Sequence, residues 1–196
     1  MKRNCTLLLL FLGCAAMVMA QAKHKAKSMA QGPSVAQVMN QQLSGVEKEF
    51  VEAADAMPAD KYNFAPSNGE FKGVRTFAQQ VKHVAAVNYV IFSDMLGEKP
   101  AVDTNGETGP DSMTSKADIM KFLRDSFALG HRAYGAITPA NEVSPIKNPF
   151  GGKQPETRLG LATLIVGHCF DHYGQMVEYL RMNGIIPPAS RPRPNR

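Results

Sequence analysis

Four long segments in which apolar residues recur every three or four positions account for most of this 196-residue chain. They cover residues 33–57, 73–96, 115–138 and 156–182, and that spacing gathers the apolar side chains on one face of an α-helix. Proline- and glycine-rich connectors separate the segments, and those after the first and third are long. Outside short pieces of the connectors, no stretch alternates apolar and polar residues as a strand does. The sequence therefore predicts an all-α four-helix bundle.

The N-terminus has the features of a secretion signal over residues 1–22. The basic pair Lys2 and Arg3 precedes an apolar run, residues 6–12, and small residues beyond it offer cleavage sites. The run is too short to remain in a membrane as a spanning helix. We therefore expect an exported protein, periplasmic or extracellular, with a lipid anchor at Cys14 as the alternative.

The expected mature chain is a single domain. Cleavage leaves roughly 175 residues, which is enough to bury a core. We expect a disordered leader at 23–32, the bundle at 33–190 and a basic tail at 191–196. Of the three cysteines only Cys169 would remain, so no intramolecular disulfide can form. The formal charge would fall from +5 to about +3, which is too little for a nucleic-acid-binding surface.

A pair of histidines in the fourth segment points to a metal site. His168 and His172 are four residues apart, so on a helix they share a face about one turn from each other. Two imidazoles so placed can bind one divalent ion from the same side, and further ligands must come from elsewhere. His83, on a partly polar face of the second segment, is the best-placed third ligand. Three imidazoles suit Zn²⁺ or Ni²⁺ and leave one to three positions for water or substrate.

Three polar residues share helix faces with these histidines and are expected to line the site. They are Gln79 in the second segment and Asp171 and Gln175 in the fourth. Asp171 could orient an imidazole or accept a proton, and Gln175 could position a water molecule. The alternative is that all three are ordinary polar residues at the rim of a bundle.

Other interpretations of the histidines stay open. They could be buried residues that are each hydrogen-bonded, although burying adjacent imidazoles without a shared ion costs polar desolvation twice. The order of residues 168–172 resembles the H-x-x-E-H pattern of inverted zinc peptidases, but Asp171 is one methylene shorter than Glu and no downstream Glu ligand follows in a helix. Cys169 points about 100° away from His168 and is expected to pack rather than bind. His131 in the third segment is a candidate fourth ligand.

In several motifs the chain resembles the DinB family of damage-inducible proteins, also called DinB/YfiT-like metalloenzymes. The resemblance covers residues 35–190, and its motifs occur in the family's order and spacing. They are YNFAP at 62–66, FAQQVKHVA at 77–85, GHCFDHYGQ at 167–175 and GIIPPAS at 184–190.

The resemblance implies an up-down-down-up bundle with a three-histidine site that often holds Zn²⁺ or Ni²⁺. The family's histidines correspond to His83, His168 and His172. Homodimers are common among relatives, and some relatives are thiol-dependent isomerases or transferases. An export signal departs from most relatives, which are cytoplasmic, and the thiols that they use are scarce outside the cytoplasm.

We therefore expect a divalent-metal-dependent enzyme, either a hydrolase or a thiol-dependent transferase, with an unknown small-molecule substrate. No residue is assigned a catalytic role. The alternative is a non-catalytic bundle that binds a metal or a small ligand, and a third option is a dimerising scaffold with no ion. Neither nucleic acid nor a stable membrane span is expected.

Overall fold

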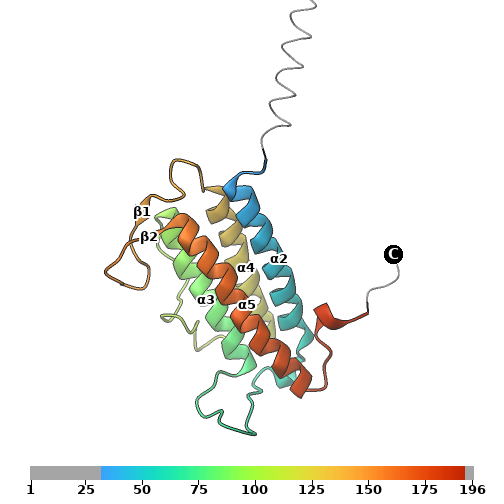
Figure 1. Ribbon diagram of the computed structural model, residues 1–196. Coiled ribbons are helices and arrows are strands. Elements are labelled where there is room, and N and C mark those ends of the chain that lie inside the picture. The colour runs from blue at the N-terminus through green and yellow to red at the C-terminus, as the bar shows by residue number, and fades with distance from the viewer. Residues whose placement is uncertain (1–31, 193–196) are drawn as a thin grey trace, which may run out of the picture. The chain divides into compact units, whose positions relative to one another are not determined.

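The computed structural model describes residues 32–192, so the predicted signal segment with Cys14, most of the leader and the end of the tail lie outside it. Within these residues four α-helices pack side by side as a bundle, and Figure 1 shows their arrangement. They are α2 (Val35–Ala56), α3 (Phe77–Leu96), α4 (Lys116–Gly135) and α5 (Arg158–Met182). The predicted all-α four-helix class is confirmed.

The order and direction of the helices follow from their contacts. Both α2 and α3 pack against α4 and α5, so α2 and α3 occupy opposite corners. Lys116 at the start of α4 donates to a carbonyl just past the end of α2, so these two helices are antiparallel. Near the end of α4, Arg132 binds Glu98 just past α3, and Arg158 at the start of α5 reaches the last turn of α3. The bundle therefore runs up-down-down-up, as expected.

The connectors carry the remaining regular structure. Two 3-10 turns and two short antiparallel strands lie among residues 32–192: η1 (Ala59–Lys61), η2 (Pro188–Ser190), β1 (Pro145–Ile146) and β2 (Glu156–Thr157). Both strands lie in the connector before α5. The connectors were the parts of the chain in which the sequence allowed short extended pieces. No helix in the described part of the chain combines the length and the apolar character needed to cross a membrane.

Helix α3 begins four residues later than the sequence predicts, because a capping box fixes its start. The Thr76 hydroxyl accepts from the Gln79 backbone N–H, and the Gln79 side chain accepts from the Thr76 N–H. Upstream, Gly73 has φ +80°. This left-handed conformation prevents α3 from beginning at residue 73, where the sequence predicts its start. The start of α3 is thereby set two turns before His83.

Close helix packing depends on Gly130 in α4. A Cβ atom there would lie 2.5 Å from Phe92 Cε2 in α3 and 3.0 Å from Leu43 in α2. Phe92 also meets Tyr134 edge to face, with ring centroids 5.6 Å apart. Three helices therefore approach one another at a point where only a hydrogen fits.

Candidate metal centre

The three histidines converge between α3 and α5. The ring centroids lie 5.1 Å apart for His83 and His168, 4.7 Å for His83 and His172, and 4.6 Å for His168 and His172. One nitrogen from each ring lies within 4.8 Å of the other two. The structure thus brings together the residues predicted to be ligands, while their binding of an ion stays a prediction.

One nitrogen pair already has the spacing of two ligands on one ion. His83 Nε2 and His168 Nε2 are 3.2 Å apart. Two imidazole nitrogens bound tetrahedrally at the usual Zn–N length would be separated by about 3.3 Å. Without an ion, the same distance fits a hydrogen bond in which one ring is the donor.

Burial keeps these imidazoles neutral. Only 5% of the surface of His83 and 6% of that of His172 is exposed. Desolvation is the main cause that lowers the pKa of each ring, that of His168 to about 3 and that of His172 to about 4. Arg75 also lowers the pKa of all three, and neighbouring imidazoles lower those of His168 and His172 further. A neutral imidazole has the lone pair that a metal ion requires.

A loop carbonyl fixes the tautomer of His83. His83 Nδ1 lies 2.6 Å from the carbonyl oxygen of Glu107, in the connector between α3 and α4. Because a carbonyl can only accept, Nδ1 carries the proton and Nε2 presents its lone pair to the cluster. The adjacent Lys82 donates to the Pro110 carbonyl at 2.9 Å, which holds the same loop against α3.

A chain of side-chain hydrogen bonds fixes the tautomer of His172. The Asp171 carboxylate accepts from Gln175 Nε2 at 3.2 Å, and Gln175 Oε1 accepts from Gln80 Nε2 at 2.8 Å. That leaves Gln80 Oε1 to accept from His172 Nδ1 at 2.6 Å. The carboxylate only accepts, so it sets the direction of every bond, and Nε2 of His172 is left unprotonated.

The third ring, His168, has a nitrogen without a partner. Its Nδ1 is buried and makes no hydrogen bond within residues 32–192. A buried polar atom left unpaired costs about 1–3 kcal/mol. The ring is therefore oriented so that its other nitrogen, Nε2, faces His83.

The polar residues expected around the site have separate positions. Asp171 and Gln175 belong to the chain of bonds that ends at His172, whereas Gln79 is exposed and caps α3. The contact to His172 is made by Gln80, which was not among the predicted site residues. Cys169 is fully buried, as expected of a packed residue.

His131 lies elsewhere in the bundle. Its Nδ1 and Nε2 are each 2.7 Å from side-chain oxygens of α2, those of Asn40 and Glu47 respectively. Both ring nitrogens are therefore engaged between α4 and α2. His131 is not part of the cluster of three.

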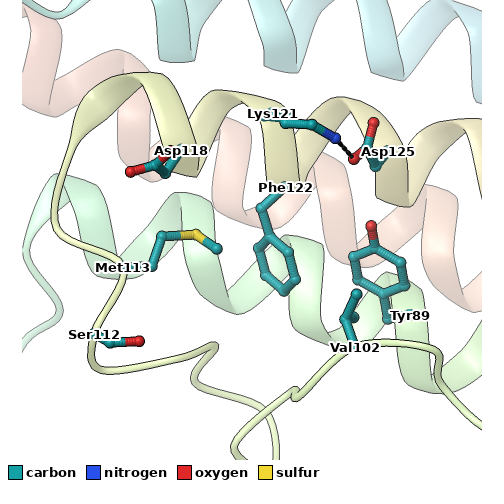
Figure 2. Close-up of a pocket in the computed structure, with 8 residues that line it drawn as sticks. All are labelled: Tyr89, Val102, Ser112, Met113, Asp118, Lys121, Phe122 and Asp125. Carbon is teal, nitrogen blue, oxygen red and sulfur yellow. Dashed lines mark hydrogen bonds and ion pairs between the residues drawn. The ribbon is translucent and has the colours of Figure 1, made fainter.

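A cavity of about 380 Å³ lies between α3, α4 and the connector that joins them. Figure 2 shows Phe122 and Tyr89 within it and a Lys121–Asp125 ion pair along its α4 side. Phe122 and Tyr89 stack with ring centroids 5.0 Å apart. None of the three histidines lines this cavity, although its connector also supplies the carbonyl of Glu107.

The donor set fits a divalent ion. Three neutral imidazoles from two helices, two of them oriented by hydrogen bonds to their second nitrogen, match the usual environment of histidine ligands. Three ligands leave at least one position of a tetrahedral ion for another molecule. The residues present would therefore suit an ion that also contacts a substrate.

Comparison with known proteins places the bundle among related folds. The sequence model of the DinB superfamily matches residues 42–176 of the chain. A conserved protein from Enterococcus faecalis superposes with a TM-score of 0.60 at 17% identity, covering 77% of this chain and 98% of that one. A DinB-like protein from Bacillus cereus gives a TM-score of 0.62 at 19% identity, covering 76% and 93%. No curated protein sequence matches the chain.

Proposed function

The chain belongs to the DinB superfamily, and on that premise we propose that it is a divalent-metal-dependent enzyme whose ion is held by His83, His168 and His172. One observation carries the proposal: three neutral imidazoles converge, those of His83 and His172 buried and that of His168 half-buried. Two of them, His83 and His172, have their second nitrogen fixed by a hydrogen bond. The imidazole ligands favour zinc or nickel.

A divalent ion held there would act as a Lewis acid and would lower the pKa of a water or thiol molecule beside it. The chain supplies a proton acceptor nearby. Asp171 is exposed, uses one carboxylate oxygen for Gln175 and has the other available. Its negative charge raises the pKa of His168 against the larger effect of burial, which indicates that the carboxylate lies near the cluster. We assign Asp171 the role of accepting the proton of the attacking molecule.

Between the two reaction types, we favour hydrolysis of a small molecule. We propose that the first 22 residues direct export to the periplasm or the exterior, with a lipid anchor at Cys14 as the alternative. Low-molecular-weight thiols are scarce there and water is not. We also propose a homodimer, as the family resemblance implies.

The test is whether a ligand from solution can reach the ion. Metal-free protein is loaded with Co²⁺, whose visible spectrum reports its coordination, and azide is added. The proposal predicts that azide changes the spectrum in a saturable manner at one ion per chain. An unchanged spectrum at full loading indicates a closed site and contradicts the proposed enzyme.

A second candidate is a metal-binding bundle without catalysis, favoured by the burial of His83 and His172. It predicts one bound ion and no turnover. A panel of small ester, amide and phosphoester substrates is assayed with zinc- and nickel-loaded protein, metal-free protein and His168→Ala. Hydrolysis that needs the ion and is lost in His168→Ala supports the enzyme, and its absence across the panel supports the second candidate.

A further inference from the structure

We propose that Arg75 gives the site a preference for anionic substrates, with a carboxylate or another oxyanion bound by its guanidinium while the reacting group faces the three histidines. This inference rests on the proposed function. It names the chemical class of the substrate and a residue outside the predicted site.

The backbone places Arg75 at the end of both helices that form the site. Arg75 directly precedes Thr76, the residue that caps α3, and so lies at the end of α3 from which His83 is reached. Helix α3 rises about 9 Å between its first residue, Phe77, and His83. Arg75 lies two residues before Phe77, so a substrate must be several bonds long to extend from its guanidinium to the histidines. The Tyr179 hydroxyl, two turns beyond His172 on α5, donates to the Arg75 carbonyl at 3.0 Å. Arg75 is therefore anchored to α5 as well as to α3.

The side chain of Arg75 is available for a ligand. It is exposed and makes no ion pair with any residue between 32 and 192. Other arginines are engaged: both terminal nitrogens of Arg132 bind Glu98, each at 2.8 Å, and Arg158 binds the carbonyl of Met95. A guanidinium left in solvent beside a polar cluster is suited to bind an anion.

The charge of Arg75 acts on the whole cluster. After burial, which is the main cause, Arg75 contributes to the lowered pKa of each of the three histidines. The acidic residues each affect one ring: Glu107 raises the pKa of His83, and Asp171 raises that of His168. This agrees with a guanidinium within electrostatic range of all three rings rather than beside one of them.

These charges also give a substrate its orientation. The imidazoles are neutral, so a bound divalent ion would be the largest local charge. Glu107 and Asp171 would repel an anionic group, and Arg75 would attract it. The guanidinium fork matches the oxygens of a carboxylate or a tetrahedral oxyanion. A substrate with its anionic group several bonds from its reacting group would therefore lie with that group at Arg75.

Matched thiols can test the preference without knowledge of the substrate. Each thiol binds the ion of Co²⁺-loaded protein through sulfur and gives a charge-transfer band that can be titrated. 2-Mercaptoethanol is neutral, 3-mercaptopropionate carries a carboxylate, and 2-mercaptoethanesulfonate carries a tetrahedral oxyanion. The inference predicts at least about tenfold tighter binding of one or both anionic thiols than of the neutral one. The stronger of the two identifies the preferred oxyanion.

The variants assign the preference to one residue. Arg75→Gln should bring the three affinities within about twofold of one another, with the affinity for 2-mercaptoethanol and the cobalt content unchanged. Arg75→Lys keeps the charge without the fork and should give an intermediate preference. Arg124→Gln removes an exposed arginine on α4 and should keep the full preference.

The outcomes separate this inference from the proposed function. If all three thiols bind equally to the wild type, or if Arg75→Gln keeps the preference, the role of Arg75 is wrong while the open metal site stands. If no thiol binds to fully loaded protein, the proposed function fails and this inference fails with it.

Discussion

The side-chain oxygen of Gln80 lies 2.6 Å from Nδ1 of His172, which makes Gln80 the direct partner of a predicted metal ligand. Through Gln175, the same amide connects that ligand to the carboxylate of Asp171. An acid at the solvent-exposed end of the chain of bonds thus decides which nitrogen of a buried ring carries its proton. Helices α3 and α5 are joined at the level of the site by the same bonds.

We predict that Gln80→Leu weakens metal binding about 10–100-fold, because His172 loses the acceptor that fixes its tautomer and orientation. A chromophoric chelator that competes for zinc measures the affinity. Gln79→Ala is the matched control. It removes half of the capping box and should lower the free energy of unfolding by about 1 kcal/mol, with zinc affinity unchanged. Equal zinc affinity in Gln80→Leu and wild type would show that this hydrogen bond does not act on the ligand.

The metal-free protein should lose stability as the pH falls below neutrality. In the folded state burial lowers the pKa of His168 to about 3 and that of His172 to about 4, from an ordinary value of 6.5. Between those values and 6.5 the unfolded chain binds more protons, so falling pH favours unfolding. Each such histidine contributes up to about 1.4 kcal/mol per pH unit.

Urea unfolding with a chelator at pH 7, 6 and 5 measures this dependence. His168→Asn removes one of the groups, so its free energy of unfolding should fall less steeply with pH than that of the wild type. Parallel pH profiles for the two proteins would mean that His168 is not held neutral by the fold.

His131→Leu should destabilise the bundle and leave metal binding intact. The substitution removes both contacts between His131 and α2, at a cost of about 1–2 kcal/mol in the free energy of unfolding. Thermal unfolding of the metal-free protein and the zinc content of purified protein are measured together. A lower zinc content without a loss of stability would restore His131 as a candidate ligand.

Gly130→Ala should destabilise the fold by about 1–3 kcal/mol, because the added methyl would overlap the ring of Phe92. Gly135→Ala in the same helix is the control, since nothing lies within 4 Å of a Cβ there. Denaturant unfolding compares the two variants. If both are equally stable, α3, α4 and α2 do not pack as closely as described.

The helices and the cluster of histidines were accessible to sequence reasoning because both depend on periodicity. Apolar spacing predicted all four helices to within a few residues of their ends. The four-residue step from His168 to His172 required a shared face on α5. The late start of α3 could also have been predicted, because Thr76 followed by Gln79 is a capping-box pattern.

The immediate partners of the ligands could not be predicted in the same way. The partner of His83 is the backbone carbonyl of Glu107, and any loop residue supplies a carbonyl. Gln79 shares a helix face with His83, but its side chain is used by the capping box, and α3 turns Gln80 toward α5 instead. Such partners depend on how α3 and α5 are rotated against each other, which the sequence pattern does not specify.

The metal content of protein purified without chelator tests the central claim most directly. Elemental analysis of the wild type and of His83→Ala, His168→Ala and His172→Ala, each checked for folding by circular dichroism, gives the number of ions per chain. The account predicts about one zinc or nickel ion per wild-type chain and a marked loss in each folded variant. A wild-type chain that is folded, offered these metals and still without an ion would contradict it.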